Sequence, residues 1–253
     1  MATTRAKKTS GAKKTTPYEY FAGDETEKAT GLFQLLAPDG TLVADALPVH
    51  LDRERVLDMY QGMLRIRIMD ERLITLQRQG RISFYGEARG QEATVVGMAA
   101  ALTDDDWIVP ALREAGVGIY RGLPLDDYIA QIFGNANDPS HGRQMPCHPC
   151  GRKVKYVVMS SVVSTQIPHA VGIAMGMKIR GHKNRVVVGF MGDGGTSEGD
   201  FHVGMNFAGV FHAPVVLVCQ NNQWAISTPG SAQTAAQTLA LKGLGYGIES
   251  LRV

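Results

Sequence analysis

Two polar clusters follow two successive apolar segments of this 253-residue chain, and their spacing is the strongest chemical signal in the sequence. Gly192-Asp193-Gly194-Gly195 comes directly after an apolar run, and Asn221-Asn222 comes directly after the next one, with 26 residues between Gly194 and Asn221. Strand, helix and strand at this spacing predict a βαβ unit, whose two parallel strands end at the same edge of the sheet. Asp193 and Asn222 are therefore expected to converge.

A carboxylate and a carboxamide oxygen at the carboxyl edge of a parallel sheet form a pocket suited to Mg²⁺ held jointly with ligand phosphates. Gly192, Gly194 and Gly195 let the backbone approach an anion, and the helix predicted to begin near Glu198 directs N–H groups toward the same place. The sequence therefore predicts a site for a diphosphate with its magnesium ion.

Other phosphate sites fit less well. Glycine turns after strands are common and Asn-Asn can simply make a turn, so the prediction depends on the two clusters together. A dinucleotide site requires G-x-G-x-x-G and an acidic residue about 20 residues further on, but Ser197 occupies the third glycine position and no such acid follows. The sequence also contains no G-x-x-x-x-G-K-[ST] loop.

Cys147-His148-Pro149-Cys150 is a second arrangement with chemical potential, because C-x-x-C beside a histidine can serve redox or zinc chemistry. A structural zinc site needs a second pair of ligands, and the remaining cysteine, Cys219, lies in a predicted buried strand. A redox pair of this kind sits at a helix N-terminus, whereas this one lies in a proline-rich loop. Neither role is favoured, and both stay open.

An α/β chain must position these residues. Apolar periodicity predicts helices over residues 52–79, 91–102, 124–133, 166–179 and 198–210, with Asp52 as an N-cap. Strands are predicted over residues 107–109, 156–159, 185–191 and 214–220, and their continuous apolar character is typical of a parallel sheet flanked by helices. Residues 247–253 have the alternation of a further strand, inside which the sequence stops, so we expect a domain truncated at its C-terminus.

Composition excludes several classes of protein. Hydrophobic residues make up 44% and charged residues 20%, which is typical of a globular chain. No apolar run approaches the roughly 20 residues that span a bilayer, so no membrane partner is expected. Three cysteines cannot form an even disulfide framework, which favours a reducing compartment.

The charge is concentrated at the N-terminus. The net charge is +2, but residues 1–17 contain five basic and no acidic residues, so the remainder carries −3. A basic tail on a mildly acidic body does not make a nucleic-acid-binding domain. We expect a mobile tail over residues 1–17, an extended arm over 18–50 and one domain over 51–253. The tail lacks the apolar residues of an amphipathic transit peptide, which favours the cytoplasm, with the mitochondrial matrix as the alternative.

Several segments resemble one enzyme family, the alpha subunit of the decarboxylating component of thiamine-diphosphate-dependent 2-oxo acid dehydrogenases. The Gly-Asp-Gly and Asn-Asn clusters are similar to its cofactor motif. The likeness runs from about residue 50 to residue 253 and is nearer to the branched-chain type than to the pyruvate type. It is carried by residues 192–201, 206–209, 220–228, 81–85, 113–117, 142–146 and 165–168.

The resemblance implies a thiamine diphosphate-binding fold and a role for individual residues. The Mg²⁺ ligands it implies are Asp193, Asn222 and the backbone carbonyl of Trp224. The implied diphosphate contacts are Gly192, Gly194, Gly195 and Arg113. Ser161 and Val163 would hold the aminopyrimidine, Ile226 would face the thiazolium, and His148 would face the substrate. Ser160, Thr165 and Gln166 resemble a loop that binds a monovalent cation in some relatives.

Each implied role has a structural alternative. Arg113 could form a surface ion pair, the apolar residues could pack in a core, and His148 could be an ordinary surface residue. The sequence also departs from the family at Leu112, where many relatives have a tyrosine, and at Gln220, where branched-chain members have an arginine. The family's phosphate-loop histidine would lie beyond Val253.

The expected function is that of an alpha subunit in a 2-oxo acid dehydrogenase complex, which oxidatively decarboxylates branched-chain 2-oxo acids and acylates a lipoyl group. The resemblance implies a beta subunit, a lipoyl-bearing acyltransferase and a heterotetramer, because the glutamate that activates the cofactor comes from the beta chain. Pyruvate as the substrate is one alternative. A truncated, non-catalytic cofactor-binding or assembly subunit is another.

Overall fold

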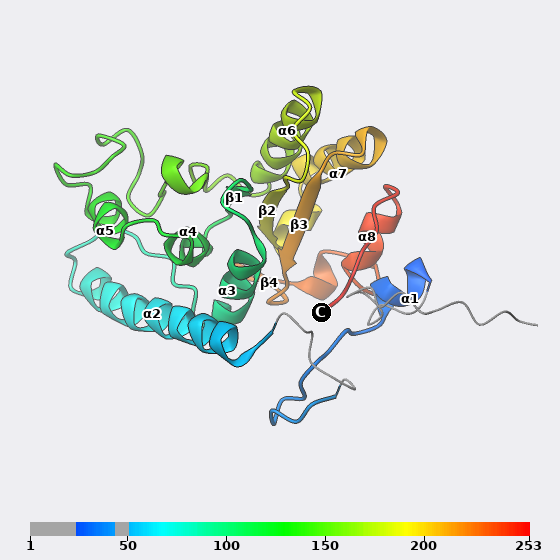
Figure 1. Cartoon of the computed structure of the whole chain (residues 1–253), viewed down its shortest axis with the longest axis horizontal. Helices are drawn as coiled ribbons and strands as arrows, with labels where there is room; N and C mark the ends of the chain where they lie inside the picture. The colour runs from blue at the N-terminus through cyan, green and yellow to red at the C-terminus, as the bar shows by residue number, and fades with distance from the viewer. Residues whose placement is uncertain (1–23, 44–50) are drawn as a thin grey trace, which may run out of the picture.

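The computed structural model describes residues 24–43 and 51–253 (Figure 1). The predicted basic tail over residues 1–17 lies outside the described residues, as do residues 18–23 and 44–50 of the predicted arm.

A three-stranded parallel sheet forms the centre of the structure. Its strands are β1 (Trp107–Val109), β2 (Val187–Gly192) and β3 (Val215–Gln220), in the order β1-β2-β3. The register pairs Val187 with Val215 and Gly192 with Gln220, so β2 and β3 begin and end at the same levels. The prediction of a parallel sheet from the continuous apolar segments is confirmed.

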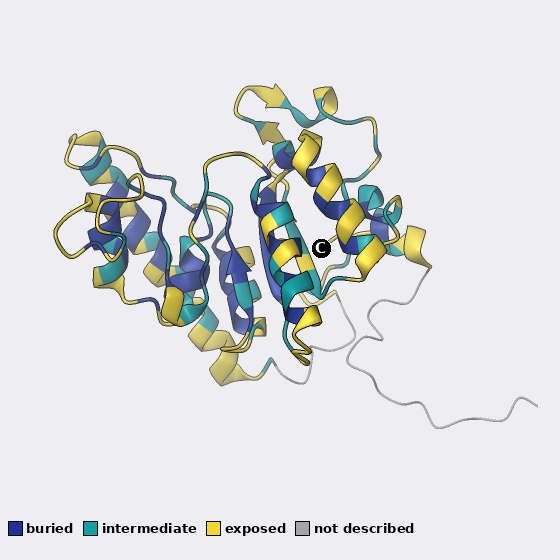
Figure 2. Ribbon diagram, turned by 90° about the horizontal axis from the view of Figure 1, so that it is seen from above, coloured by how far each residue is buried: buried dark blue, intermediate teal, exposed yellow. Residues whose placement is uncertain are grey.

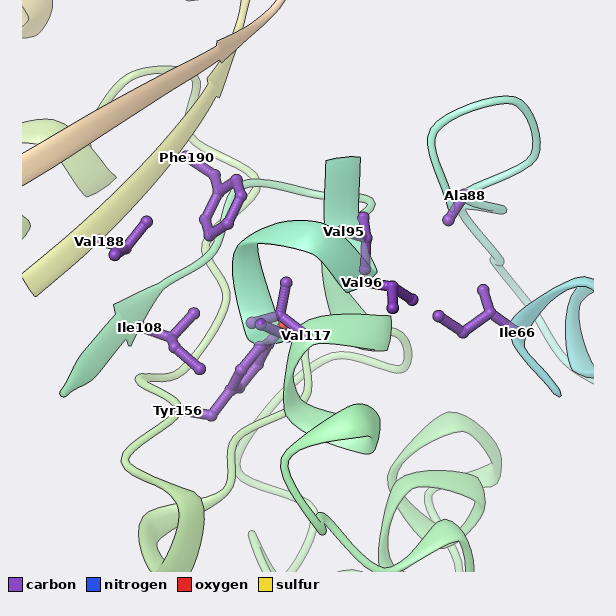
Figure 3. Packing of buried hydrophobic residues seen from close by; sticks show 10 residues of the cluster. Ile66, Ala88, Val95, Val96, Ile108, Val117, Tyr156, Val188 and Phe190 are labelled. Carbon is purple, nitrogen blue, oxygen red and sulfur yellow. The ribbon is translucent and has the colours of Figure 1, made fainter. Parts of the chain in front are cut away.

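Successive side chains of the strands point to opposite faces, and each face is covered by helices. Val188 and Phe190 point toward α2 (Arg53–Arg78) and α3 (Glu92–Ala101), as Figure 3 shows. Val187 and Met191 point the other way, toward α6 (Gln166–Ile179) and α7 (Gly199–Phe211). Seen from above, the sheet is buried between helices whose outer faces are exposed (Figure 2). The predicted α/β class is confirmed.

The helix boundaries follow local signals in the sequence. The Asp52 side chain accepts a hydrogen bond from the Arg55 N–H at 2.8 Å, which confirms it as the N-cap of α2. The helix stops before Gly80, whose φ of 70° is in the left-handed region. Helix α5 (Leu125–Phe133) follows Pro124, as predicted.

Helix α4 (Ala115–Tyr120) was not predicted, because its glycines lower helix propensity. The structure gives the reason for Gly116. A Cβ atom at this position would lie 2.4 Å from Cδ1 of Ile66 in α2 and 2.7 Å from Cγ1 of Val95 in α3, so glycine lets α4 pack closely against both side chains. Tertiary contact therefore decides this element.

Two predicted strands are wrong. Residues 156–159 form no strand, because Tyr156 makes only single bridges to Ile108 and Gly151. Lys155, with φ 54°, turns the chain just before this bridge. Residues 247–253 form no strand either; their alternation reflects packing of Ile248 against the cluster that contains Met191 and Phe201.

The described part of the arm packs on the C-terminal segment. It contains the helix α1 (Glu25–Thr30), so the expectation of an extended conformation is wrong there; Asp24 and Glu27 form a capping box that starts this helix. The Thr238 hydroxyl donates to the Ala29 carbonyl at 2.7 Å, just before α8 (Ala240–Leu244), and Phe33 N–H donates to the Arg252 carbonyl at 2.8 Å. Figure 1 shows α1 beside α8.

The remaining elements are short. They are the 3₁₀ turns η2 (Arg152–Val154), η3 (Asp193–Ser197) and η4 (Gly230–Ala232), and a two-stranded antiparallel hairpin, β4 (Trp224–Ala225) with β5 (Thr228–Pro229). None of the described helices has both the length and the apolar content needed to cross a bilayer.

Two helix glycines differ in the space around them: Gly209 in α7 is crowded, and Gly172 in α6 is open. A Cβ atom at Gly209 would lie 2.0 Å from the Tyr246 carbonyl oxygen, so Gly209→Ala forces backbone to move and is expected to lower the free energy of unfolding by about 1–3 kcal/mol. Gly172 in α6 has no atom within 4 Å of that position, so Gly172→Ala should raise it by about 0.5–1 kcal/mol. Urea unfolding of both variants measures the difference, and equal effects would contradict the packing described.

Candidate functional site

The register of the sheet brings the two polar clusters to one edge. Because Gly192 is paired with Gln220, Asp193 and Asn221 leave the sheet side by side. The hairpin β4–β5 then folds back onto η3, since a Cβ atom at Gly194 would lie 2.5 Å from Cβ of Ala225. The residues predicted to bind Mg²⁺ therefore lie at the same edge.

Asp193 is a buried carboxylate with no cationic partner. Its side chain is 4% exposed, and Oδ2 accepts one long hydrogen bond, at 3.4 Å, from Gln233 Nε2. No lysine, arginine or histidine of the described chain forms an ion pair with it. A buried charge is costly unless it is neutralised, so this carboxylate fits a metal ion.

Asn222 and Trp224 supply neutral oxygens. Asn222 Oδ1 accepts the Trp224 N–H at 2.9 Å and keeps a second lone pair. In the hairpin, Gly230 N–H donates to the Gln223 carbonyl at 2.8 Å, which makes Trp224 and Pro229 the next, non-hydrogen-bonded pair. The Trp224 carbonyl therefore points out of the hairpin, and carboxylate, amide and carbonyl oxygens form a donor set that fits Mg²⁺.

The carbonyl groups of the glycine turn are held by side chains. The Thr196 hydroxyl donates to the Asp193 carbonyl at 2.8 Å, and the Ser164 hydroxyl donates to the Gly195 carbonyl at 2.5 Å. Lys242 Nζ donates to the Thr196 carbonyl at 3.0 Å. These bonds occupy carbonyl groups of the turn. The first N–H groups of a helical turn have no carbonyl partner inside it, so the first residues of η3 present theirs outward.

Sequence reasoning missed Ser164, Gln233 and Lys242. Ser164 follows the predicted residues Ser161 and Val163 directly, and its φ of 70° turns its loop toward η3. Its position next to these predicted residues was the one signal in the sequence that could have indicated Ser164. Gln233 and Lys242 come from segments with no motif, so only the fold brings them to the turn.

Arg113 follows β1 at the same edge of the sheet. Its Nη1 donates to the Glu87 carbonyl, and its guanidinium forms no ion pair with any carboxylate side chain of the described residues. The surface ion pair considered as an alternative is therefore not formed. The guanidinium is half-buried and keeps donors for an anion.

Glu114 links the loop after β1 to the end of β3. It is 2% exposed, its Oε2 accepts the Arg113 N–H at 3.1 Å, and Gln220 Nε2 donates to its Oε1. Burial raises the pKa of Glu114 to about 7, although hydrogen bonds from the backbone oppose the shift. Gln220 gives this carboxyl group a neutral partner.

His148 is buried, with 6% exposure, so the alternative of an ordinary surface residue is wrong. Its Nδ1 bonds to the Pro146 carbonyl at 3.1 Å, and because a carbonyl only accepts, Nδ1 carries the proton. Nε2 is buried and has no partner among the described residues. An unpaired buried nitrogen of this kind fits contact with a ligand.

The residues predicted to hold the organic part of a cofactor are exposed in the single chain. Val163 is 56% exposed, Ile226 is fully exposed at the tip of the hairpin, and Ser161 is also exposed. The alternative of core packing is therefore wrong for these apolar residues. Ile226 also has φ 56°, which is strained for a β-branched residue.

The residues predicted to bind a monovalent cation have mixed support. Gln166 Oε1, in the loop predicted to bind a monovalent cation, is buried without a donor, whereas Ser160 Oγ accepts the Val162 N–H at 3.3 Å.

Burial raises the pKa of both Cys147 and Cys150, which leaves their thiols protonated at neutral pH. Across residues 24–43 and 51–253, no three histidine, cysteine or acidic side chains are grouped to hold a metal ion.

Comparison with known proteins identifies the family. The profile of the family "Dehydrogenase E1 component" matches residues 60–253. This match covers most of the chain, and the chain belongs to that family.

Among its relatives are alpha subunits of 2-oxoisovalerate dehydrogenases. The chain is 42% identical over 238 residues to the mitochondrial alpha 2 subunit of Arabidopsis thaliana, which covers 94% of this chain and 50% of that protein. It is 45% identical to the Bos taurus subunit and 44% identical to the Homo sapiens subunit, in each case over 222 residues and 88% of this chain, with 49% and 50% of those proteins covered. The chain spans about half the length of these relatives.

A solved structure from Mycobacterium smegmatis, described as a thiamin diphosphate-dependent enzyme, aligns with 61% of this chain and 25% of its own. The identity is 20% and the TM-score is 0.41, which is too low to carry an argument.

The raised pKa of Glu114 predicts a pH-dependent stability. The carboxyl group binds its proton more tightly when folded than when unfolded, so its contribution is full below pH 4.5 and is lost as the pH rises through about 7. The loss amounts to roughly 3 kcal/mol at most. Relative to Glu114→Gln, the wild-type chain should lose stability between pH 4.5 and pH 8 in urea unfolding. Parallel pH profiles for the two proteins would contradict the assignment.

Proposed function

We propose that this chain binds thiamine diphosphate with Mg²⁺ and acts as the alpha subunit of a branched-chain 2-oxo acid dehydrogenase. The observation that carries the proposal is the buried Asp193 carboxylate, which has no cationic partner and lies at the same sheet edge as Asn222 and Trp224. The family and the names of the relatives support the same function.

The residues at the edge divide into two groups. In this proposal, Asp193, Asn222 and the Trp224 carbonyl hold the magnesium ion. Gly192, Gly194 and Gly195 line the diphosphate, and Arg113 neutralises part of its charge through paired N–H donors. The space between Gly194 and Ala225 admits no Cβ atom, so a glycine at this position keeps the turn close to the hairpin.

A second group of residues contacts the rest of the cofactor and the substrate. Ser161 and Val163 hold the aminopyrimidine, and Ile226 lies against the thiazolium. When bound, thiamine diphosphate supplies the electron sink for loss of CO₂ from a 2-oxo acid. His148, with its proton on Nδ1, offers its buried Nε2 as an acceptor toward the substrate.

The exposure of Val163 and Ile226 supports a site that another chain completes. We propose that the completing chain is the beta subunit of the same enzyme, in a heterotetramer, and that a lipoyl-bearing acyltransferase receives the acyl group. Exposed apolar side chains next to a polar site are typical of protein interfaces.

The finer points of the proposal rest on single observations. The names of the relatives favour branched-chain 2-oxo acids over pyruvate as substrates. The unpaired Gln166 Oε1 supports a monovalent cation beside the site. The names of the relatives support the mitochondrial matrix, the alternative location.

Removal of the proposed metal ligand tests the cofactor site. Asp193→Ala should abolish Mg²⁺-dependent binding of thiamine diphosphate, because no other carboxylate of the donor set can replace it. Calorimetric titration of the chain together with the beta subunit, with and without Mg²⁺, measures the effect. Asp104→Ala, which removes an exposed carboxylate near the amino end of β1, is the matched control and should bind like the wild type. Unchanged binding by Asp193→Ala would refute the site.

Product analysis tests the substrate and the activity. Together with a beta subunit, the chain should release CO₂ from 2-oxoisovalerate faster than from pyruvate. A preference for pyruvate would favour the alternative that the chain is the alpha subunit of a pyruvate dehydrogenase. Cofactor binding without release of CO₂ from either acid would favour a non-catalytic subunit.

A further inference from the structure

A buried carboxylate on α2, outside the proposed site, holds a segment on which that site depends. Asp70 is 1% exposed. Its Oδ1 accepts the Tyr85 hydroxyl at 2.5 Å, and its Oδ2 accepts the Ala88 N–H at 2.7 Å. Both bonds cross from α2 to residues 85–88, which we call the braced segment.

The braced segment contacts two elements of the proposed site. The Glu87 carbonyl accepts from Nη1 of Arg113, the proposed diphosphate ligand. The Gly86 N–H donates to Sγ of Cys147 at 3.5 Å, and Cys147 immediately precedes His148. One carboxylate therefore fixes both ends of a segment whose middle holds the arginine and the histidine turn.

Packing makes the braced segment rigid. Ala88 belongs to the core cluster that includes Ile66 of α2, and Figure 3 shows the two side chains next to each other. Tyr85 and Cys147 belong to a second cluster with Met69 and Leu73 of the same helix. The two hydrogen bonds of Asp70 reach one residue of each cluster, Ala88 of the first and Tyr85 of the second.

The energetic cost of burying the Asp70 carboxylate indicates that this residue has a specific role. No arginine, lysine or histidine of the described residues forms an ion pair with it, although it is almost completely buried. A buried carboxylate destabilises a fold unless hydrogen bonds compensate. An apolar residue at this position of α2 would fill the same space without that cost, but it would leave residues 85–88 without their two anchors.

We propose that Asp70 is a positioning residue for the cofactor site, which orients Arg113 and His148 through the braced segment. The proposal rests on the proposed function for the identity of the ligand. The brace itself is a property of the chain alone.

The test compares two buried aspartates with similar contacts. Asp70→Asn keeps the shape of the side chain but leaves one oxygen, so either the Tyr85 hydroxyl or the Ala88 N–H loses its acceptor. Asp106→Asn is the matched control. Asp106 is 4% exposed and accepts the N–H groups of Thr103 and Val186 at 2.7 and 2.8 Å, at the amino ends of the strands, away from the site.

The first measurement is titration of the full chain, together with the proposed beta subunit, with thiamine diphosphate and Mg²⁺. Loss of one hydrogen bond to a buried charge should weaken binding by Asp70→Asn about tenfold or more. Asp106→Asn should lower the unfolding midpoint to a similar extent and keep the wild-type affinity. Wild-type affinity of Asp70→Asn, or equal loss of affinity in both variants, would overturn the proposal.

The second measurement needs no cofactor. Cys147 is 3% exposed, and release of the braced segment should speed its alkylation by a maleimide, followed residue by residue with mass spectrometry. The rate should rise in Asp70→Asn and stay unchanged in Asp106→Asn. If the wild-type chain does not bind thiamine diphosphate even in the presence of the beta subunit, the proposed function fails, whereas unchanged alkylation of Cys147 in Asp70→Asn refutes the brace separately.

A milder variant covers the case in which Asp70→Asn does not fold. Tyr85→Phe removes the hydroxyl, which also interacts with the side chain of Tyr128, and keeps the ring in its cluster. It should change affinity and alkylation in the same direction by a smaller factor. A folded Tyr85→Phe chain that matches the wild type in both measurements would count against the proposal.

Discussion

The site depends on the register between two parallel strands. Gly192 pairs with Gln220, so the chain leaves β2 and β3 at the same level, one strand spacing of about 4.8 Å apart. The same register places Met191 and Cys219 on the face covered by α6 and α7. Because a slip of one residue would turn these side chains to the opposite face, packing of the core also fixes where Asp193 and Asn222 emerge.

Elements with strong local signals could be predicted from the sequence. Apolar periodicity was enough for α2 and α6, and Asp52 also marked the start of α2. The continuous apolar segments were enough for β2 and β3. The signals fail where tertiary contact decides. Helix α4 forms despite its glycines because Gly116 lets it approach α2, and Tyr156 bridges to Ile108 without extending into a strand.

The residues of the candidate site also divide into those that the sequence predicts and those that it does not. The topology of a βαβ unit brings Asp193 and Asn222 to one edge, and this follows from the order of strands and loops alone. The groups that hold the surrounding turns in shape come from distant segments. Lys242 is 46 residues from the Thr196 carbonyl that it binds. Asp70 lies on α2, whereas the braced segment that it anchors lies beyond the end of that helix. No local pattern marks such residues, since they are ordinary until the fold is known.

Ile226 shows what a strained backbone can do at the tip of the hairpin. The position has a left-handed conformation that β-branched residues avoid, yet the pairing of β4 with β5 maintains it. A β-branched side chain has few accessible rotamers, so the tip presents a nearly fixed apolar surface to solvent. Anything that docks there meets a shape already formed, and little side-chain freedom remains to be lost on association.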